Sequence, residues 1–104
     1  MIQFLKNLFG FSERVNIGEL IANGAAIIDV RTVGEFQNGH LKKSVNIPLN
    51  ILPNSLTKMN KNKPVITCCA SGMRSASAKS ILKSNGFTNV HNGGSWTYLR
   101  PFDN

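Results

Sequence analysis

Short apolar runs rich in β-branched residues alternate with short segments of helical character along this chain, and this alternation limits the possible folds most strongly. Residues 25–30 and 65–68 are apolar almost without interruption, rather than at every second position. Strands of that kind are buried on both faces, as in parallel sheets that helices cover on each side. A chain of 104 residues is long enough for one hydrophobic core of this kind. The pattern therefore predicts a single α/β domain with a mostly parallel sheet.

Capping and turn residues set the expected boundaries of the helices and strands. Asn16, Thr32 and Asn54 each precede a helical pattern and can accept hydrogen bonds from its first free N–H groups. Asn-Gly pairs can end helices through a left-handed glycine. The expected helices cover residues 17–22, 33–37, 55–59, 74–84 and 95–100, and the expected strands cover residues 25–30, 44–47, 65–68 and 87–90, with a turn at 92–94 after the last strand.

The chain is strongly basic, with twelve lysine and arginine residues against five acidic ones and a net charge of +7. Such a charge favours anionic small molecules and acidic partner proteins. The lysines form only short clusters without interleaved aromatic residues, so we expect no nucleic-acid partner. The two cysteines are adjacent, which rules out a disulfide framework and a cysteine-based zinc site and favours a reducing, cytoplasmic compartment.

Residues 1–14 form a separate N-terminal segment, and the main domain is expected over residues 15–104. The apolar residues of this segment recur at helical spacing but are interrupted by Lys6 and Asn7, without a small-residue cleavage site. The segment is too short to span a bilayer and makes a poor signal peptide. We expect a short amphipathic helix packed on the domain, with a peripheral membrane contact as the alternative and no integral membrane contact.

The segment from Cys69 to Arg74 has the features of a loop that holds an anion. It joins an expected strand to an expected helix, and ligands of open parallel sheets bind at such carboxyl ends of strands. Free N–H groups and the positive end of the helix dipole stabilise negative charge there, so a thiolate should form more readily than in a free cysteine. Gly72 allows a tight curl and Arg74 adds a permanent cation. Cys69 is therefore the candidate nucleophile.

The other side chains around the loop have more ordinary expected roles. Ala70 and Ser71 are small enough to leave the mouth of the loop open, and Met73 is placed to line it for a soft, sulfur-containing substrate. Cys68 should pack in the core, because successive strand side chains point to opposite faces. Structural roles are also expected for the Asp29 and Arg31 pair, for His40 and His91, and for Phe87 and Trp96, and no metal site is expected.

These motifs, in this order and spacing, make most of residues 15–99 resemble the rhodanese-like sulfurtransferases. The shared pieces are Ile28-Asp29-Val30-Arg31 with Glu35-Phe36, Gly39-His40-Leu41, Asn46-Ile47-Pro48-Leu49, Cys69 to Ser75, Gly86-Phe87, and Gly93-Gly94 with Trp96. The resemblance implies a rhodanese-like three-layer sandwich, in which a five-stranded, mostly parallel sheet is flanked by helices.

The resemblance also implies the reaction of a thiosulfate sulfurtransferase. Cys69 would take a sulfur atom from a small anionic donor, thiosulfate or a persulfide, and pass it to a thiol, to cyanide or to a protein cysteine. Backbone N–H groups would hold the thiolate and the persulfide, and these belong to Ala70, Ser71, Gly72, Met73, Arg74 and Ser75. No cofactor is implied. The loop has its one cation at the far end, whereas thiosulfate users of this family often carry basic residues earlier in it, so thiosulfate is expected to be a poor donor.

Two other functions stay open from the sequence. A rhodanese fold can serve as a non-catalytic binding module. Counting from Cys68 gives the loop spacing of cysteine phosphatases and arsenate reductases, although that longer loop would begin inside the expected strand. Several lysines are candidates to dock an acidic redox or sulfur-carrier protein, namely Lys42, Lys43, Lys58, Lys61 and Lys63.

Overall fold

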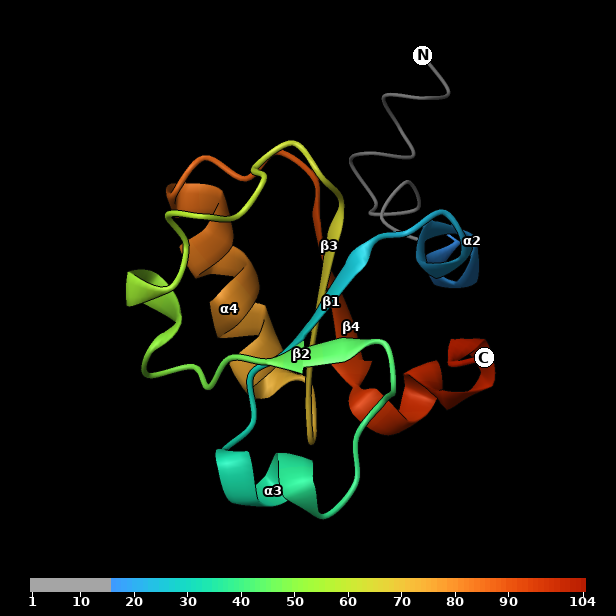
Figure 1. Cartoon of the computed structure of the whole chain (residues 1–104). Coiled ribbons are helices and arrows are strands. Elements are labelled where there is room, and N and C mark those ends of the chain that lie inside the picture. The colour runs from blue at the N-terminus through green and yellow to red at the C-terminus, as the bar shows by residue number, and fades with distance from the viewer. Residues whose placement is uncertain (1–15) are drawn as a thin grey trace.

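The computed structural model describes residues 16–104, which form a parallel sheet with helices on both faces (Figure 1). Strands β1 (Ala26–Asp29), β2 (Ser44–Asn46), β3 (Val65–Cys69) and β4 (Val90–Ser95) follow the order β2-β1-β3-β4, and all neighbours are parallel. The helices are α2 (Ile17–Ala22), α3 (Val33–Gln37) and α4 (Met73–Ser84), with 3-10 helices η2 (Leu52–Asn54) and η3 (Trp96–Phe102). The α/β prediction is confirmed, with four strands in the described residues where five were expected.

The sheet separates two hydrophobic clusters. On one face, Ala78 and Leu82 of α4 belong to a buried cluster with Val65 of β3, and on the other, Ile21 of α2 belongs to a cluster with Ile66. Figure 1 shows α4 on one side of the sheet, and α2 with the C-terminal η3 on the other. Successive side chains of a strand alternate between the two faces of the sheet. Because each face is covered by a hydrophobic cluster, the residues that point to either face must be apolar. This accounts for the unbroken apolar runs in the sequence.

Two of the three predicted helix caps are present. Asn16 accepts a hydrogen bond from the Glu19 N–H at 3.0 Å and begins α2. Thr32 and Glu35 form a capping box at α3, in which each side chain accepts from the backbone N–H of the other. The third prediction, Asn54 as a cap for residues 55–59, is wrong. Helical structure comes earlier, in η2, because Pro53 suits a first turn and Leu52 is fully buried.

The last strand also differs from the expectation. Residues 87–90 were predicted as a strand and 92–94 as a turn, but β4 covers Val90–Ser95. The glycines are strand residues here because the chain passes very close to β3: a Cβ atom at Gly93 would lie 2.8 Å from Ile66 Cγ2 and 3.0 Å from the Thr67 carbonyl oxygen. Phe87 instead packs in the core between α4 and β4. After β4, Ser95 caps η3 by accepting a hydrogen bond from the Thr97 N–H.

The membrane expectations have a limited counterpart in the structure. Within residues 16–104, no helix is long and apolar enough to cross a bilayer. The amphipathic helix expected over residues 1–14 lies outside the described residues.

Candidate active site

The Cys69 loop lies at the carboxyl end of β3, one of the two inner strands of the sheet. Cys69 is the last residue of β3, and α4 begins at Met73 with Gly72 as its N-cap. Gly72 has a φ of 102°, in the left-handed region that other residues adopt only with strain. The segment therefore turns back on itself within three residues, which directs the N–H groups of the loop towards the end of the strand.

The sulfur atom of Cys69 accepts hydrogen bonds from this curl. The Gly72 N–H donates to Sγ at 2.9 Å and the Ser75 N–H donates at 3.4 Å. The Ser75 hydroxyl oxygen lies 3.5 Å from the same sulfur. Burial of the Cys69 thiol raises its pKa, but hydrogen bonds from the Ser75 side chain and from the backbone of Ser75, Gly72 and Ser71 outweigh burial, and the net pKa is lowered. The loop favours the charged nucleophile.

Cys68 has the opposite environment, as the sequence predicted. Its side chain packs in the cluster of Ile27, Ile66 and Leu99, on the sheet face away from α4. Burial, together with the negative charge of Asp29, raises the pKa of Cys68 to about 12. A loop counted from Cys68 would therefore have its thiol on the wrong face of the sheet, which argues against the phosphatase and arsenate reductase interpretation.

Arg74, expected as a cation for the substrate, is already ion-paired. Its guanidinium binds the Glu35 carboxylate through two hydrogen bonds, of 2.7 and 3.0 Å. The hydrogen bonds from Arg74 and from the Thr32 N–H lower the pKa of Glu35 to about 2, and Glu35 in turn raises the pKa of Arg74. Glu35 thus offsets part of the charge of Arg74, in a pair that is still partly exposed to solvent. Met73, by contrast, is 79% exposed.

The other charged pair, Asp29 and Arg31, has the structural role expected of it. The Arg31 Nη2 lies 2.7 Å from the buried Asp29 carboxylate and also donates to the Gly39 carbonyl. Its guanidinium carbon lies 4.6 Å from the ring centroid of Trp96. This cluster joins the end of β1 to the segment after α3 and to η3, and Trp96 packs against the hydrophobic cluster on that face of the sheet.

Asn92 is a site residue that sequence analysis missed. Its Oδ1 atom accepts from the Ser75 hydroxyl at 2.6 Å and from the Gly94 N–H at 2.9 Å, while its Nδ2 donates to the Gly72 carbonyl at 3.2 Å. The signal was the alternation from Val90 to Asn92, which places both on the α4 face of β4. Because the sequence analysis expected a turn at residues 92–94, it did not extend the alternation of strand side chains to Asn92.

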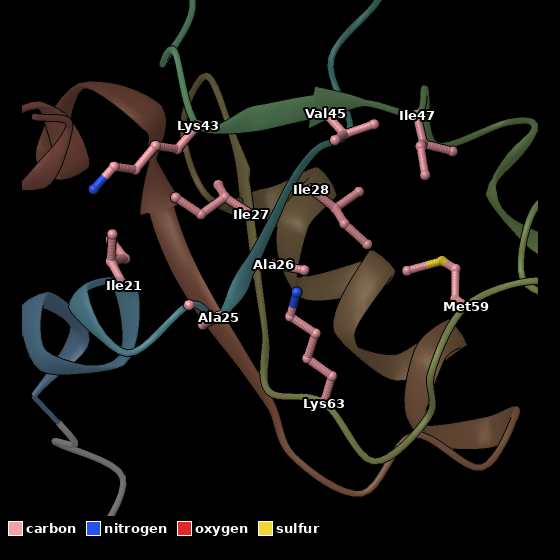
Figure 2. Close-up of a pocket in the computed structure, with 11 residues that line it drawn as sticks. Ile21, Ala25, Ala26, Ile27, Ile28, Lys43, Val45, Ile47, Met59 and Lys63 are labelled. Carbon is pink, nitrogen blue, oxygen red and sulfur yellow. The ribbon is translucent and has the colours of Figure 1, made fainter.

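A hollow lies beside the loop at the same end of the sheet. It has a volume of about 420 Å³ and is lined by Val30, Thr32, Pro48, Leu49, Asn50 and Arg74. A larger hollow, of about 680 Å³, lies elsewhere (Figure 2). Its lining comes from α2, β1, β2 and the segment before β3, with Lys43 and Lys63 among mostly apolar side chains and no residue of the Cys69 loop. Of the two hollows, only the smaller one has a residue of the Cys69–Ser75 segment, Arg74, in its lining.

Within residues 16–104, no group of three or more histidine, cysteine, aspartate or glutamate residues could hold a metal ion. His40 Nδ1 lies 2.7 Å from the Phe36 carbonyl oxygen, and its ring stacks on the Phe36 ring. His91 Nε2 lies 2.5 Å from Asn89 Oδ1. Both histidines have local partners of this kind, in agreement with their expected structural roles.

The fold and the loop together define a class of protein: an α/β domain that holds a buried cysteine sulfur in a cup of backbone N–H groups at the end of a parallel strand. Residues 15–96 match the family model described as Rhodanese-like domain, and the chain belongs to this family. The family and the fold predicted from the motifs are thereby confirmed.

Individual relatives agree with this assignment. The uncharacterized protein YqhL of Bacillus subtilis is 38% identical over 68 residues, which cover 65% of this chain and 54% of that protein. The thiosulfate sulfurtransferase GlpE of Stutzerimonas stutzeri is 33% identical over 84 residues, covering 77% of each chain. The solved structure of the human single-domain sulfurtransferase TSTD1 has the same fold, with a TM-score of 0.74 at 24% identity, over 82% of this chain and 89% of that one. The chain thus spans about half the length of the first relative.

Proposed function

We propose that this chain is a sulfurtransferase that carries sulfur as a persulfide on Cys69. The observation that carries the proposal is the hydrogen bonding of Cys69 Sγ by the N–H groups of Gly72 and Ser75, at 2.9 and 3.4 Å. A thiolate stabilised in this way is a nucleophile and a good leaving group. Membership of the rhodanese-like family and the name of the Stutzerimonas relative support the same reaction.

The first half-reaction transfers a sulfur atom from the donor to Cys69. The Cys69 thiolate attacks the outer sulfur of a donor, a new S–S bond forms, and the donor's own bond to that sulfur breaks. The electron pair of the broken bond leaves with the donor remnant, which is sulfite for thiosulfate and a thiolate for a small persulfide. Negative charge then rests on the outer sulfur of the Cys69 persulfide, within reach of the N–H groups of residues 70–75.

The second half-reaction removes this sulfur atom from Cys69. A thiol acceptor in its thiolate form, or cyanide, attacks the outer sulfur, and Cys69 departs as a thiolate. The hydrogen bonds that lower the pKa of Cys69 also stabilise this leaving group. The same cup therefore serves both steps, and the two steps share no ternary complex, which gives ping-pong kinetics.

The pairing of Arg74 favours a persulfide over thiosulfate as the better donor. Thiosulfate carries two negative charges at neutral pH, and its sulfonate end needs cationic or N–H partners. Glu35 accepts from Nη1 and Nη2 of Arg74 at 2.7 and 3.0 Å, so this ion pair reduces the positive charge that Arg74 offers to an anion at the mouth of the loop. The exposed Met73 and the largely apolar hollow beside Arg74 suit a neutral or soft sulfur compound instead.

Donor kinetics test the proposal. Sulfur transfer to cyanide is measured with thiosulfate and with glutathione persulfide, for the wild type, Cys69→Ser and Cys68→Ser. We expect parallel double-reciprocal lines, a higher kcat/KM for the persulfide, no transfer by Cys69→Ser and near-normal transfer by Cys68→Ser. Transfer that survives in Cys69→Ser would reject the mechanism. Absence of transfer by the wild type would favour the binding-module alternative.

A further inference from the structure

The hydroxyl of Ser75 lies between two groups that compete for its single proton. Its oxygen is 2.6 Å from Asn92 Oδ1 and 3.5 Å from Cys69 Sγ. The orientation of the Asn92 amide is fixed independently, because Oδ1 also accepts from the Gly94 N–H and Nδ2 donates to the Gly72 carbonyl. Asn92 Oδ1 is an acceptor only, so the Ser75 proton must lie on the Asn92 side of this contact.

This arrangement matches the neutral form of Cys69. The thiol proton can then donate to a lone pair of the Ser75 oxygen, and Ser75 donates onward to Asn92 Oδ1. The chain of donors breaks when the thiol ionises, because the thiolate has no proton to give and faces the Ser75 oxygen lone pairs. A hydrogen bond from Ser75 to the thiolate requires the hydroxyl to rotate away from Asn92.

We propose that Asn92 is a positioning residue that holds the Ser75 proton away from Cys69 and so restrains ionisation of the thiol. This inference rests on the proposed function only for its catalytic consequence. In the persulfide, the charge lies on the outer sulfur and Sγ is neutral, so the Ser75 proton can return to Asn92. When an acceptor removes the outer sulfur, Sγ must leave as a thiolate and needs that proton again. Asn92 thereby acts on the unloading step through Ser75.

The charged groups around Cys69 do not interfere with this competition. Arg74 of α4 is paired with Glu35 of α3, and Arg31 is paired with Asp29 at the end of β1. On β3, Cys68 lies on the opposite face of the sheet. On β4, His91 is the sequence neighbour of Asn92, so its side chain points to the other face, and its Nε2 contacts Asn89. Substitutions at Ser75 and Asn92 leave all these groups in place.

The test is a double-mutant cycle on the titration of Cys69. Ultraviolet absorbance of the thiolate is followed against pH for the wild type, Ser75→Ala, Asn92→Ala and the double variant, with Cys69→Ser protein as the blank. We expect Asn92→Ala to move the midpoint to lower pH, with about threefold more thiolate below the midpoint. Ser75→Ala should move it to higher pH, and the double variant should titrate like Ser75→Ala.

The effect of Asn92→Ala on the titration midpoint should require Ser75. This requirement distinguishes the proposed role of Asn92 from simple structural support of the loop. A midpoint unchanged in Asn92→Ala, or shifted equally with and without Ser75, would overturn the proposal. Should Asn92→Ala fold poorly, Asn92→Asp keeps and strengthens the acceptor, and it should raise the midpoint more when Ser75 is present than in the Ser75→Ala background. No sulfur donor is used, so a wild type that forms no persulfide would contradict the proposed function alone.

Discussion

At the scale of single residues, the proposed chemistry of this chain depends on where the protons around Cys69 point. Two N–H groups, from Gly72 and Ser75, are directed at the sulfur by backbone geometry alone. That geometry requires Gly72 at a φ of 102°. The loop around Cys69 could be predicted from the sequence, because it depends on the local order of residues 69–75. The role of Cys69 as the nucleophile stays a prediction. The contact with Asn92 could not be predicted, because it joins residues 17 positions apart on different elements.

Replacing Gly72 by alanine tests the backbone requirement. A side chain at this φ strains the loop, and we expect about 1 kcal/mol of lost stability in urea unfolding together with a more than tenfold slower loading of Cys69 by glutathione persulfide. Gly24→Ala is the matched control, since Gly24 has a φ of 93° and open space around it, far from the loop. This variant should lose a similar amount of stability, and glutathione persulfide should transfer sulfur to its Cys69 at the wild-type rate. Equal loading rates in the two variants would argue against the N–H cup.

At the scale of elements, the strands and helices were predictable where capping and burial act locally. The capping box of Thr32 with Glu35 begins α3, and Asn16 begins α2, at the residues expected. Strand β4 was misplaced because its glycines look like a turn in isolation. Their role is set by β3, whose Ile66 and Thr67 approach Gly93 too closely for a side chain. Such a constraint becomes visible only when the two strands are side by side.

Gly93→Ala tests this explanation of β4. A Cβ atom there would lie 3.0 Å from a backbone oxygen, which cannot move as a side chain does, so we expect about 1 to 3 kcal/mol of lost stability. Gly34→Ala, within α3 and with nothing near its added Cβ, should instead gain up to about 1 kcal/mol. Urea unfolding of each variant and of the wild type measures both changes in stability. A neutral Gly93→Ala would mean that β4 does not approach β3 as described.

At the scale of the whole molecule, charge and topology act together. The parallel sheet brings the ends of β1, β2 and β3 to one edge, where Glu35 of α3 meets Arg74 of α4 across 39 positions of sequence. The net charge of +7 attracts anions in general, but this pair reduces the positive charge at the loop itself. The sequence indicated a poor thiosulfate site from a missing cation, and the ion pair adds a second reason.

Glu35→Gln should release the charge of Arg74 while keeping a hydrogen-bond acceptor beside it. With a pKa of about 2, the Glu35 carboxyl stays ionised down to strongly acidic pH, so substitution rather than acid is the means to neutralise it. We expect KM for thiosulfate to fall about two- to fivefold at low salt, with little change at high salt. Glu19→Gln, exposed on α2, removes the same charge elsewhere and should leave KM unchanged. An identical effect of both variants would point to net charge alone.

Intact mass spectrometry after exposure to glutathione persulfide tests the central claim most directly. The wild type and Cys68→Ser should each gain the mass of about one sulfur atom and lose it again on addition of a thiol, because Cys69 bears the transferable sulfur. Cys69→Ser should gain nothing. A gain retained in Cys69→Ser and absent from Cys68→Ser would place the chemistry on the other cysteine and contradict the account.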